Sequence, residues 1–211
     1  MTPMALPVVA YLLGALPVSL WVARGWSGRD LRRVGSGNTG ATNVLRTAGW
    51  FPAVLAFLGD AAKGALPVLL GEYLAVSERI LAATALAAVL GHVFSPLLRF
   101  RGGKGVATAL GGFSVLAPLV ALCVVGLFIV LVWTTRYVSV GSICAVLSFP
   151  LIWLGLSFWG WEQPPTIALL AATSAVGALV LWRHADNLRR LWQGSETRVG
   201  ARLAGGQREM R

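Results

Sequence analysis

Charged side chains are scarce in this sequence. Asp, Glu, Lys and Arg make up only 12% of its 211 residues, whereas they make up about 25% of a typical soluble domain. Hydrophobic residues account for 56% of the chain, and the mean hydropathy is +0.72. This composition excludes an ordinary soluble domain and predicts an integral membrane protein.

Acidic residues and cysteines are few. Eight Asp and Glu stand against eighteen Lys and Arg, which gives a formal net charge of +10. Because no soluble module is left to bind nucleic acid, this charge indicates phosphate head groups or phosphorylated substrates as partners. Cys123 and Cys144 lie in apolar stretches without CxxC spacing or a nearby histidine, so we assign them to packing. We expect no metal site and no cofactor.

The first apolar stretch lacks the charge pattern of a cleavable signal peptide. No charged residue precedes residues 4–23, and Arg24, Arg29, Arg32 and Arg33 follow them. A signal peptide carries its positive charges before the apolar run. We therefore expect this stretch to stay in the protein as a membrane anchor.

Five apolar stretches are each long enough to cross about 30 Å of hydrocarbon as a helix. They are residues 4–23, 51–71, 79–98, 141–159 and 166–182. A further stretch, residues 106–135, is too long for one upright span and short for two, since a helix rises about 1.5 Å per residue.

The distribution of Lys and Arg decides how the chain crosses at residues 106–135. If a break near Pro118 makes two spans, every Lys and Arg except Lys63 and Arg79 falls on one side. A single span would place the arginine-rich C-terminus opposite the first basic loop, against the positive-inside rule. The sequence therefore predicts an all-α transmembrane bundle of about seven spans, with the N-terminus out and the C-terminus in.

The chain is expected to form a single integral membrane domain over residues 1–211. Its spans are rich in Ala and Gly, which lets helices approach closely in lipid. No internal repeat is visible, which argues against transporter folds built on inverted repeats. Residues from about 192 to 211 combine glycines with arginines and are expected to form a mobile basic tail attracted to anionic lipid.

The first basic segment, residues 35–46, is dense in Gly, Ser, Thr and Asn and ends at Arg46. Glycines allow backbone N–H groups to turn toward a phosphate, and an arginine can bind it through two hydrogen bonds. The alternative is a flexible loop before a helix whose N-cap is Thr39, Thr42 or Asn43.

The second basic segment, residues 99–108, places Gly-Gly-Lys-Gly immediately before an expected helix. The N–H groups at a helix start attract phosphate, and Lys104 adds a mobile positive charge. The segment is not a P-loop, because the GxxxxGK[ST] spacing is absent. The alternative is a basic membrane anchor with a glycine turn.

The third basic segment, residues 183–190, follows the last span. His184 and Asn187 are three residues apart, so they share a face if the helix continues. A snorkelling basic helix end would account for the arginines alone.

Ionisable residues inside the spans are expensive and are usually paired or functional. Asp60 and Lys63, three residues apart, are expected to form a structural ion pair. His92 fits equally a buried, hydrogen-bonded histidine and a donor in the site. Ser142, after the short turn that begins at Arg136, is expected near the basic segments.

Together these segments resemble the bacterial membrane glycerol-3-phosphate acyltransferases that use acyl phosphate as donor, the PlsY family. The resemblance covers essentially the whole chain and rests on residues 36–46, 91–108, 137–142 and 183–187 in that order. It implies transfer of a fatty acyl group from acyl phosphate to the 1-hydroxyl of sn-glycerol 3-phosphate. Lysophosphatidic acid and phosphate are the products, in the first step of phospholipid synthesis.

The resemblance also implies the setting and the residue roles. The expected location is the bacterial inner membrane, among membrane lipids, with the active site facing the cytoplasm and an acyl-phosphate-producing enzyme as partner. The catalytic residues it implies are Ser36, Lys104, His184 and Asn187. The substrate-binding residues are Asn38, Thr42, Arg46, His92, Gly102, Gly103, Gly105 and Ser142.

An acyl phosphate is already activated, so positioning and oxyanion stabilisation should supply most of the acceleration. No general base is obvious beyond Asp186 and the histidines, and we expect the phosphate of glycerol 3-phosphate to accept the proton. The HxxxxD pair typical of acyl-CoA acyltransferases is missing, because Leu97 and Arg189 stand five residues after the two histidines. The competing interpretation is a transporter of a small phosphorylated anion, whose site would lie near the bilayer midplane.

Overall fold

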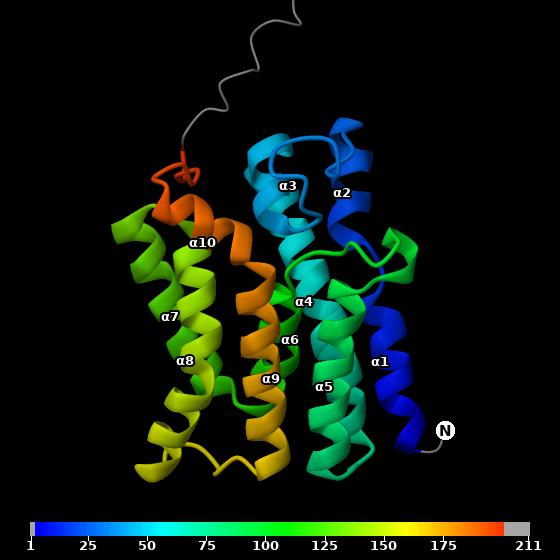
Figure 1. Ribbon diagram of the computed structural model, residues 1–211. Coiled ribbons are helices and arrows are strands. Elements are labelled where there is room, and N and C mark those ends of the chain that lie inside the picture. The colour runs from blue at the N-terminus through cyan, green and yellow to red at the C-terminus, as the bar shows by residue number, and fades with distance from the viewer. Residues whose placement is uncertain (1–2, 201–211) are drawn as a thin grey trace, which may run out of the picture.

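The computed structural model describes residues 3–200, and this part of the chain consists of helices and connecting segments without a strand (Figure 1). The α-helices are α1 Leu6–Gly14, α2 Val18–Ser27, α3 Ala41–Ala48, α4 Trp50–Tyr73, α5 Glu78–Val93, α6 Val106–Leu116, α7 Pro118–Thr135, α8 Val138–Phe158, α9 Ile167–Arg183 and α10 Ala185–Trp192. Two short 3-10 helices, η1 Pro3–Ala5 and η2 Pro96–Leu98, precede α1 and follow α5.

Within residues 3–200, five helical stretches are long and apolar enough to cross a membrane. They are Pro3–Ser27, Trp50–Tyr73, Glu78–Leu98, Pro118–Thr135 and Val138–Phe158. Counting α9 together with α10, which is bent from it by 53°, makes six. The all-α transmembrane bundle is confirmed, whereas the total of seven spans and their orientation stay predictions.

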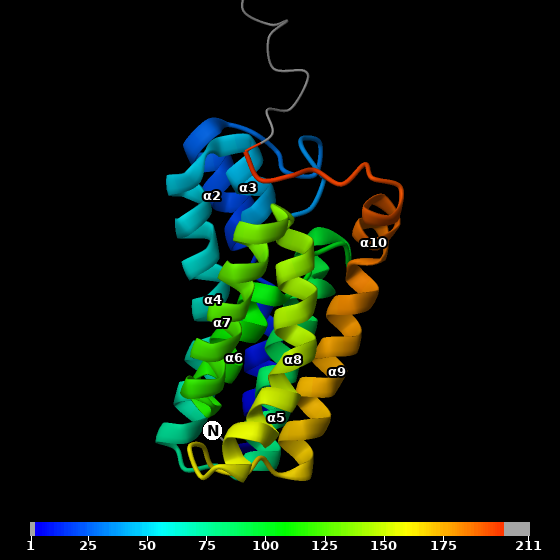
Figure 2. The ribbon, with the colours of Figure 1, turned by 90° about the vertical axis from the view of Figure 1, so that its left-hand side faces the viewer.

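The stretch 106–135 breaks beside Pro118. Helix α6 ends at Leu116 and α7 begins at Pro118, with Ala117 in a non-helical conformation between them. Proline suits the first position of a helix because no intrahelical partner exists for an N–H there. The two helices run in opposite directions from this turn (Figures 1 and 2). The predicted break near Pro118 is therefore confirmed, whereas the count of two spans here stays a prediction.

Helix α6 has only eleven residues, which gives it a length of roughly 16 Å. It is held against α4 by glycines that allow the two backbones to touch. A Cβ on Gly64 would lie 2.0 Å from the Thr108 carbonyl oxygen, and one on Gly111 would lie 2.0 Å from that of Ala61. This contact places the N-terminus of α6, and Lys104 just before it, at a fixed height in the bundle.

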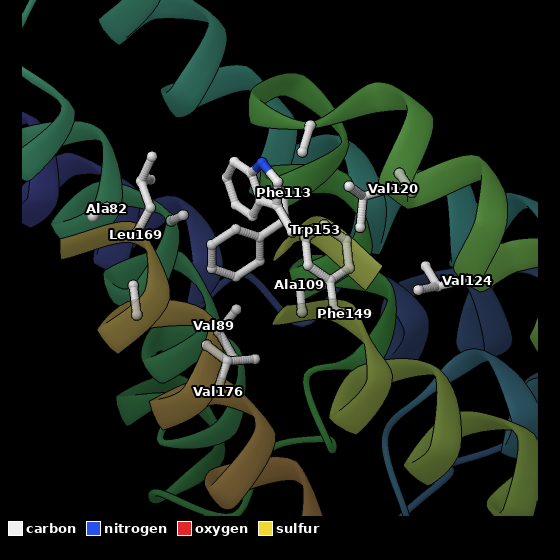
Figure 3. Packing of buried hydrophobic residues seen from close by; sticks show 14 of the residues in the cluster. Ala82, Val89, Ala109, Phe113, Val120, Val124, Phe149, Trp153, Leu169 and Val176 are labelled. Atoms are coloured by element: carbon white, nitrogen blue, oxygen red, sulfur yellow. The ribbon is translucent and has the colours of Figure 1, made fainter. Parts of the chain in front are cut away.

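Aromatic rings from α6 and α8 fill the centre of the bundle (Figure 3). The rings of Phe113 and Phe149 lie 5.7 Å apart, and Trp153 meets Phe149 edge-on at 5.9 Å. The buried Trp153 Nε1 donates a hydrogen bond to the Gln163 carbonyl oxygen at 2.9 Å, which satisfies its polar atom. This cluster forms a rigid floor beneath the polar end of the molecule.

The basic segments gather at one end of the bundle. The connections from α2 to α3, from α5 to α6 and from α7 to α8 lie toward the upper end in Figures 1 and 2, where α3 and α10 also lie. The opposite end carries the turns that follow α4 and α8, with Glu72, Glu78, Arg79 and Glu162. The clustering expected from the positive-inside rule is therefore present in the fold.

Candidate active site

A cavity of about 720 Å³ extends from the basic end into the bundle. Its polar walls come from α3, α10 and the segments before α3 and α6, and its apolar walls come from α6, α7, α8 and α9. Eleven of the twelve predicted site residues line it: Ser36, Asn38, Thr42, Arg46, His92, Gly102, Lys104, Gly105, Ser142, His184 and Asn187. Gly103 is the exception.

The first basic segment is held by the side chain of Asn43, which is 1% exposed. Its Oδ1 accepts a hydrogen bond from the Ser36 amide at 2.9 Å. Its Nδ2 donates to the carbonyl oxygens of Leu31, Val34 and Asn38 at 3.1, 3.0 and 2.9 Å. One buried amide thus fixes the backbone that presents Ser36 and Asn38 to the cavity. Sequence reasoning did not place Asn43 in this role.

The alternative interpretation of this segment, a helix with its N-cap at Thr39, Thr42 or Asn43, is wrong. The helix begins after Gly40, and no side chain caps it. Asn43 lies inside the helix instead, because its side chain satisfies the preceding loop rather than the helix end. Arg46, on the same helix, is half-buried in the cavity wall and forms no ion pair within residues 3–200. Its guanidinium is therefore free to bind an anion.

The glycine turn before α6 presents backbone N–H groups. The Gly102 amide donates to the Val93 carbonyl oxygen at 3.0 Å, and Arg183 donates to the Gly102 carbonyl oxygen at 2.9 Å. In the described chain, the amides of Gly103 and Lys104 donate to no backbone carbonyl. Two unpaired donors beside a lysine at a helix start form a suitable phosphate cradle.

The Cα of Gly103 faces the ring of His92. A Cβ at this position would lie 2.1 Å from Nε2 of His92. The His92 ring is buried against the turn, and its Nδ1 lies 3.7 Å from Oδ1 of Asp60. His92 therefore borders the cavity with its Nε2 covered by Gly103, which favours a supporting role over proton transfer.

The predicted ion pair between Asp60 and Lys63 is confirmed, at 2.9 Å with both residues buried. Ser19 donates to the other carboxylate oxygen of Asp60 at 2.5 Å, and Lys63 donates to the Leu16 carbonyl oxygen at 2.8 Å. These bonds neutralise a costly charge and tie α4 to the break between α1 and α2.

The third basic segment is bent rather than continuous. Helix α9 ends at Arg183, and α10 leaves it at 53° after His184. The helix does not continue through His184, yet His184 and Asn187 both line the cavity. The His184 Nδ1 donates to the Val180 carbonyl oxygen at 2.8 Å, since a carbonyl can only accept. This leaves Nε2 as an acceptor.

A chain of hydrogen bonds joins the second and third basic segments. Lys104 Nζ donates to Asn187 Oδ1, although the two residues are 83 positions apart in the sequence. Asn187 Nδ2 donates in turn to Oε1 of Glu196 at 2.6 Å, and Ser139 and Arg190 also donate to this carboxylate. Glu196 thereby holds Asn187 with its amide oxygen toward the lysine.

Sequence reasoning missed Glu196, which falls in the expected tail. The structure describes residues 193–200 as a segment that folds back, with Glu196 only 7% exposed, while residues 201–211 of that tail lie outside the described residues. An acidic residue among arginines was the available signal. The segment thus has a contact role that attraction to lipid did not anticipate.

The inner half of the cavity is apolar. Phe113, Val125, Phe128, Ile129 and Phe149 border it from α6, α7 and α8. This half belongs to the same cavity as the polar half. The cavity thus has the shape and chemistry to hold a molecule with an anionic head and an aliphatic chain.

Comparison with known proteins identifies the family. Residues 4–194 match the sequence profile described as glycerol-3-phosphate acyltransferase. The chain belongs to this family. The acyltransferase is 43% identical over 197 residues to glycerol-3-phosphate acyltransferase 1 of Deinococcus radiodurans. The matched region covers 93% of this chain and 96% of the relative. It is 45% identical over 195 residues to the glycerol-3-phosphate acyltransferase of Syntrophotalea carbinolica, with 92% and 96% covered.

Two solved structures have the same fold. One is PlsY, an integral membrane glycerol 3-phosphate acyltransferase, in its glycerol 3-phosphate form, with a TM-score of 0.85 and 39% identity over 95% of this chain and 96% of that one. The other is described as the lysophosphatidic acid form, with a TM-score of 0.82 and 36% identity over the same shares. The protein is therefore an acyltransferase enzyme and a multi-pass membrane protein.

The charge of Lys104 is predicted to set the upper end of the pH range in which the acyltransferase is active. Burial lowers the Lys104 pKa to about 8, with Arg190, Arg46 and Arg183 adding to the shift and Glu196 opposing it. If the cation binds phosphate, kcat/KM should fall as pH rises above about 8, where the free enzyme loses this proton. In Lys104→Arg, the guanidinium stays charged at this pH, so kcat/KM should no longer fall above about pH 8. If kcat/KM of Lys104→Arg still falls as in wild type, another titrating group causes the fall.

Removing Glu196 is predicted to impair both folding and turnover. Burial alone would raise the Glu196 pKa, but hydrogen bonds from Asn187, Arg190 and Ser139 hold it below its usual range. Glu196→Ala leaves these donors unpaired, so the thermal unfolding midpoint in detergent should drop and kcat should fall by about a hundredfold. Glu72→Ala, at the opposite end, is the control. An unchanged midpoint and an unchanged kcat in Glu196→Ala would contradict this role.

Proposed function

We propose that the enzyme transfers a fatty acyl group from acyl phosphate to the 1-hydroxyl of sn-glycerol 3-phosphate. The products are lysophosphatidic acid and inorganic phosphate. The observation that carries this proposal is the continuity of one cavity, polar with two clusters of anion-binding groups at one end and apolar at the other. It matches a reaction between two phosphates, one of which carries an aliphatic chain.

The reaction needs one bond made and one broken at the acyl carbon. The 1-hydroxyl oxygen of glycerol 3-phosphate attacks the carbonyl carbon, and the bond from that carbon to the bridging phosphate oxygen breaks. Phosphate leaves with the electron pair. The hydroxyl proton passes to an acceptor in the site, so atoms and charges balance without a cofactor.

The residues divide between two anions. We assign the acyl phosphate to the unpaired amides of the glycine turn, with Lys104 above them and the chain along α6, α7 and α8. Arg46 and the segment around Ser36 then hold the phosphate of glycerol 3-phosphate. Asn187 fixes Lys104 through its amide oxygen. Ser142 and His184, both buried in the cavity wall, complete the polar surface.

We propose that the phosphate of glycerol 3-phosphate accepts the proton from the attacking hydroxyl. His92 faces the Gly103 backbone with its Nε2, and Asp186 is an exposed residue at the mouth. A phosphate dianion, with a second pKa of about 6, is a competent base near neutral pH. Loss of a general base can reduce activity to about one part in ten thousand of the wild-type value. We therefore expect more activity than this from each of three variants: His92→Ala, His184→Ala and Asp186→Asn.

The proposal also includes the acyl donor and the cellular location of the enzyme. No HxxxxD pair is present for an acyl-CoA acyltransferase, and an acyl phosphate places its anionic leaving group where the glycine turn can receive it. We place the enzyme in the bacterial inner membrane, with the basic end in the cytoplasm, as the positive-inside rule requires. There it would meet soluble glycerol 3-phosphate and an enzyme that produces acyl phosphate.

The test supplies the purified enzyme, in neutral-lipid vesicles, with labelled glycerol 3-phosphate and either acyl phosphate or acyl-CoA. Labelled lysophosphatidic acid is expected with acyl phosphate alone. Product from acyl-CoA alone would overturn the donor. Product from neither donor, with uptake of the label into the vesicles, would replace the proposal with transport of a phosphorylated anion.

A further inference from the structure

A second hollow, of about 800 Å³, adjoins the active-site cavity. Its walls come from the segment between α2 and α3 and from the segment after α5, which lie near each other at the same end in Figure 1. We call it the arginine vestibule, lined by Arg32, Arg33, Gly37, Leu98, Arg99 and Arg101. Gly37 and Arg101 also line the active-site cavity, so the two spaces share a wall.

The positive charge of the vestibule is largely uncompensated. Arg32 pairs with Asp30 at 2.7 Å. Arg33, Arg99 and Arg101 are exposed, and none of them forms an ion pair within residues 3–200. Anchoring by the positive-inside rule accounts for arginines on this face, but it does not require two distant segments to bring them into one hollow.

The backbone after α5 adopts an unusual shape where it enters the vestibule. Arg99 and Phe100 have φ angles of 52° and 60°, in the left-handed region that residues other than glycine rarely occupy. Hydrogen bonds from the Arg99 and Phe100 amides to Pro96 and Ser95, at 3.0 and 2.8 Å, hold this turn. Such strain persists where the surrounding structure enforces it, often at functional sites. Here it delivers both Arg99 and Arg101 to the same hollow.

We propose that the arginine vestibule captures phosphate-monoester dianions from water and passes them to the active site. This inference rests on the proposed function, because the dianion that the reaction requires is glycerol 3-phosphate. A rim of unpaired cations beside a low-dielectric cavity raises the local concentration of an anion and speeds its association. A lipid phosphate offers the same chemistry, but it would arrive from the bilayer rather than from water.

The test removes two cations that lie outside the active-site cavity, in the double variant Arg33→Gln/Arg99→Gln. Equilibrium dialysis without any acyl donor should show Kd for glycerol 3-phosphate raised about tenfold. In turnover, KM for glycerol 3-phosphate should rise equally, while kcat and KM for acyl phosphate stay within about twofold. The difference from wild type should shrink at high salt, since the Debye length falls from about 30 Å at 0.01 M to about 3 Å at 1 M.

Two further variants separate charge from shape. Arg189→Gln/Arg198→Gln removes two exposed cations, one in α10 and one beside Tyr137, and is the matched control, expected to bind glycerol 3-phosphate like wild type. Arg33→Gln/Arg99→Lys restores one positive charge and should recover part of the lost affinity for glycerol 3-phosphate. Capture needs positive charge rather than the paired hydrogen bonds of a guanidinium group.

Three outcomes would contradict the role proposed for the arginine vestibule. One is an unchanged Kd and KM in Arg33→Gln/Arg99→Gln, which would reduce these residues to membrane anchors. Another is an equal loss in the Arg189→Gln/Arg198→Gln control, which would indicate net charge alone. The third is an effect seen in vesicles with anionic lipid but absent in neutral ones, which would assign the hollow to lipid phosphate. Because dialysis needs no turnover, failure of the proposed reaction would be seen separately.

Discussion

Replacing Lys104 by methionine is expected to lower kcat/KM by about a thousandfold. The lysine lines the cavity, in a hydrogen bond to Asn187 and beside the unpaired amides of the glycine turn. Charge that develops on the leaving phosphate and on the carbonyl oxygen is stabilised most strongly by a fixed cation in a water-poor site, and removing one such group typically costs 10²- to 10³-fold or more. Steady-state rates with both substrates varied would measure the loss.

Two controls accompany Lys104→Met. The thermal unfolding midpoint should change little, because the lost hydrogen bond to Asn187 is offset by relief from burying a charged lysine. Arg189→Gln, which removes a cation whose side chain is 71% exposed, should leave kcat/KM within about twofold. Retention of more than about a tenth of wild-type kcat/KM by a folded Lys104→Met enzyme would place the central cation elsewhere.

Gly103→Ala is expected to lower kcat/KM by about a hundredfold, although the residue does not line the cavity. The new methyl group would lie 2.1 Å from Nε2 of the buried His92, so either the turn or the ring must move. A shift of about 1 Å in a group that positions substrate can cost about 10² in rate. The loss should be measured with saturating acyl phosphate and with saturating glycerol 3-phosphate in turn.

A double-mutant cycle tests whether the contact with His92 causes this loss. His92→Ala removes the ring, so Gly103→Ala should cost much less in that background than in wild type. Gly126→Ala, in α7, meets no atom within 4 Å and serves as the control for a neutral glycine substitution. Equal costs of Gly103→Ala with and without the His92 ring would contradict the account.

Composition and charge were enough to predict an all-α transmembrane bundle. Apolar length located the helices, and the bias of Lys and Arg divided residues 106–135 at Pro118, where the structure also divides them. These signals succeed because lipid forces backbone hydrogen bonds into helices and because basic residues stay on one side. They carry no information on helix length at the polar end, so the short α6 could not be foreseen.

The candidate site was predictable in membership but not in its internal contacts. Segments rich in Gly, Ser and Asn identified the residues that meet around Lys104 and Asn187. The contacts of Asn43, Glu196 and His92 depend on how loops fold onto one another, which local spacing does not encode. The bend at His184 likewise could not be predicted, because no proline or glycine stands at that position.

The central claim is that Lys104, the glycine turn and Arg46 bind two phosphates at one end of a cavity whose other end receives an acyl chain. The most direct test is an experimental structure of the enzyme with glycerol 3-phosphate and an acyl phosphonate that cannot transfer its chain. The account predicts both phosphorus groups within hydrogen-bonding reach of these residues, with the chain between α6, α7 and α8. An acyl chain outside that groove, or a phosphate bound at the opposite end of the bundle, would contradict it.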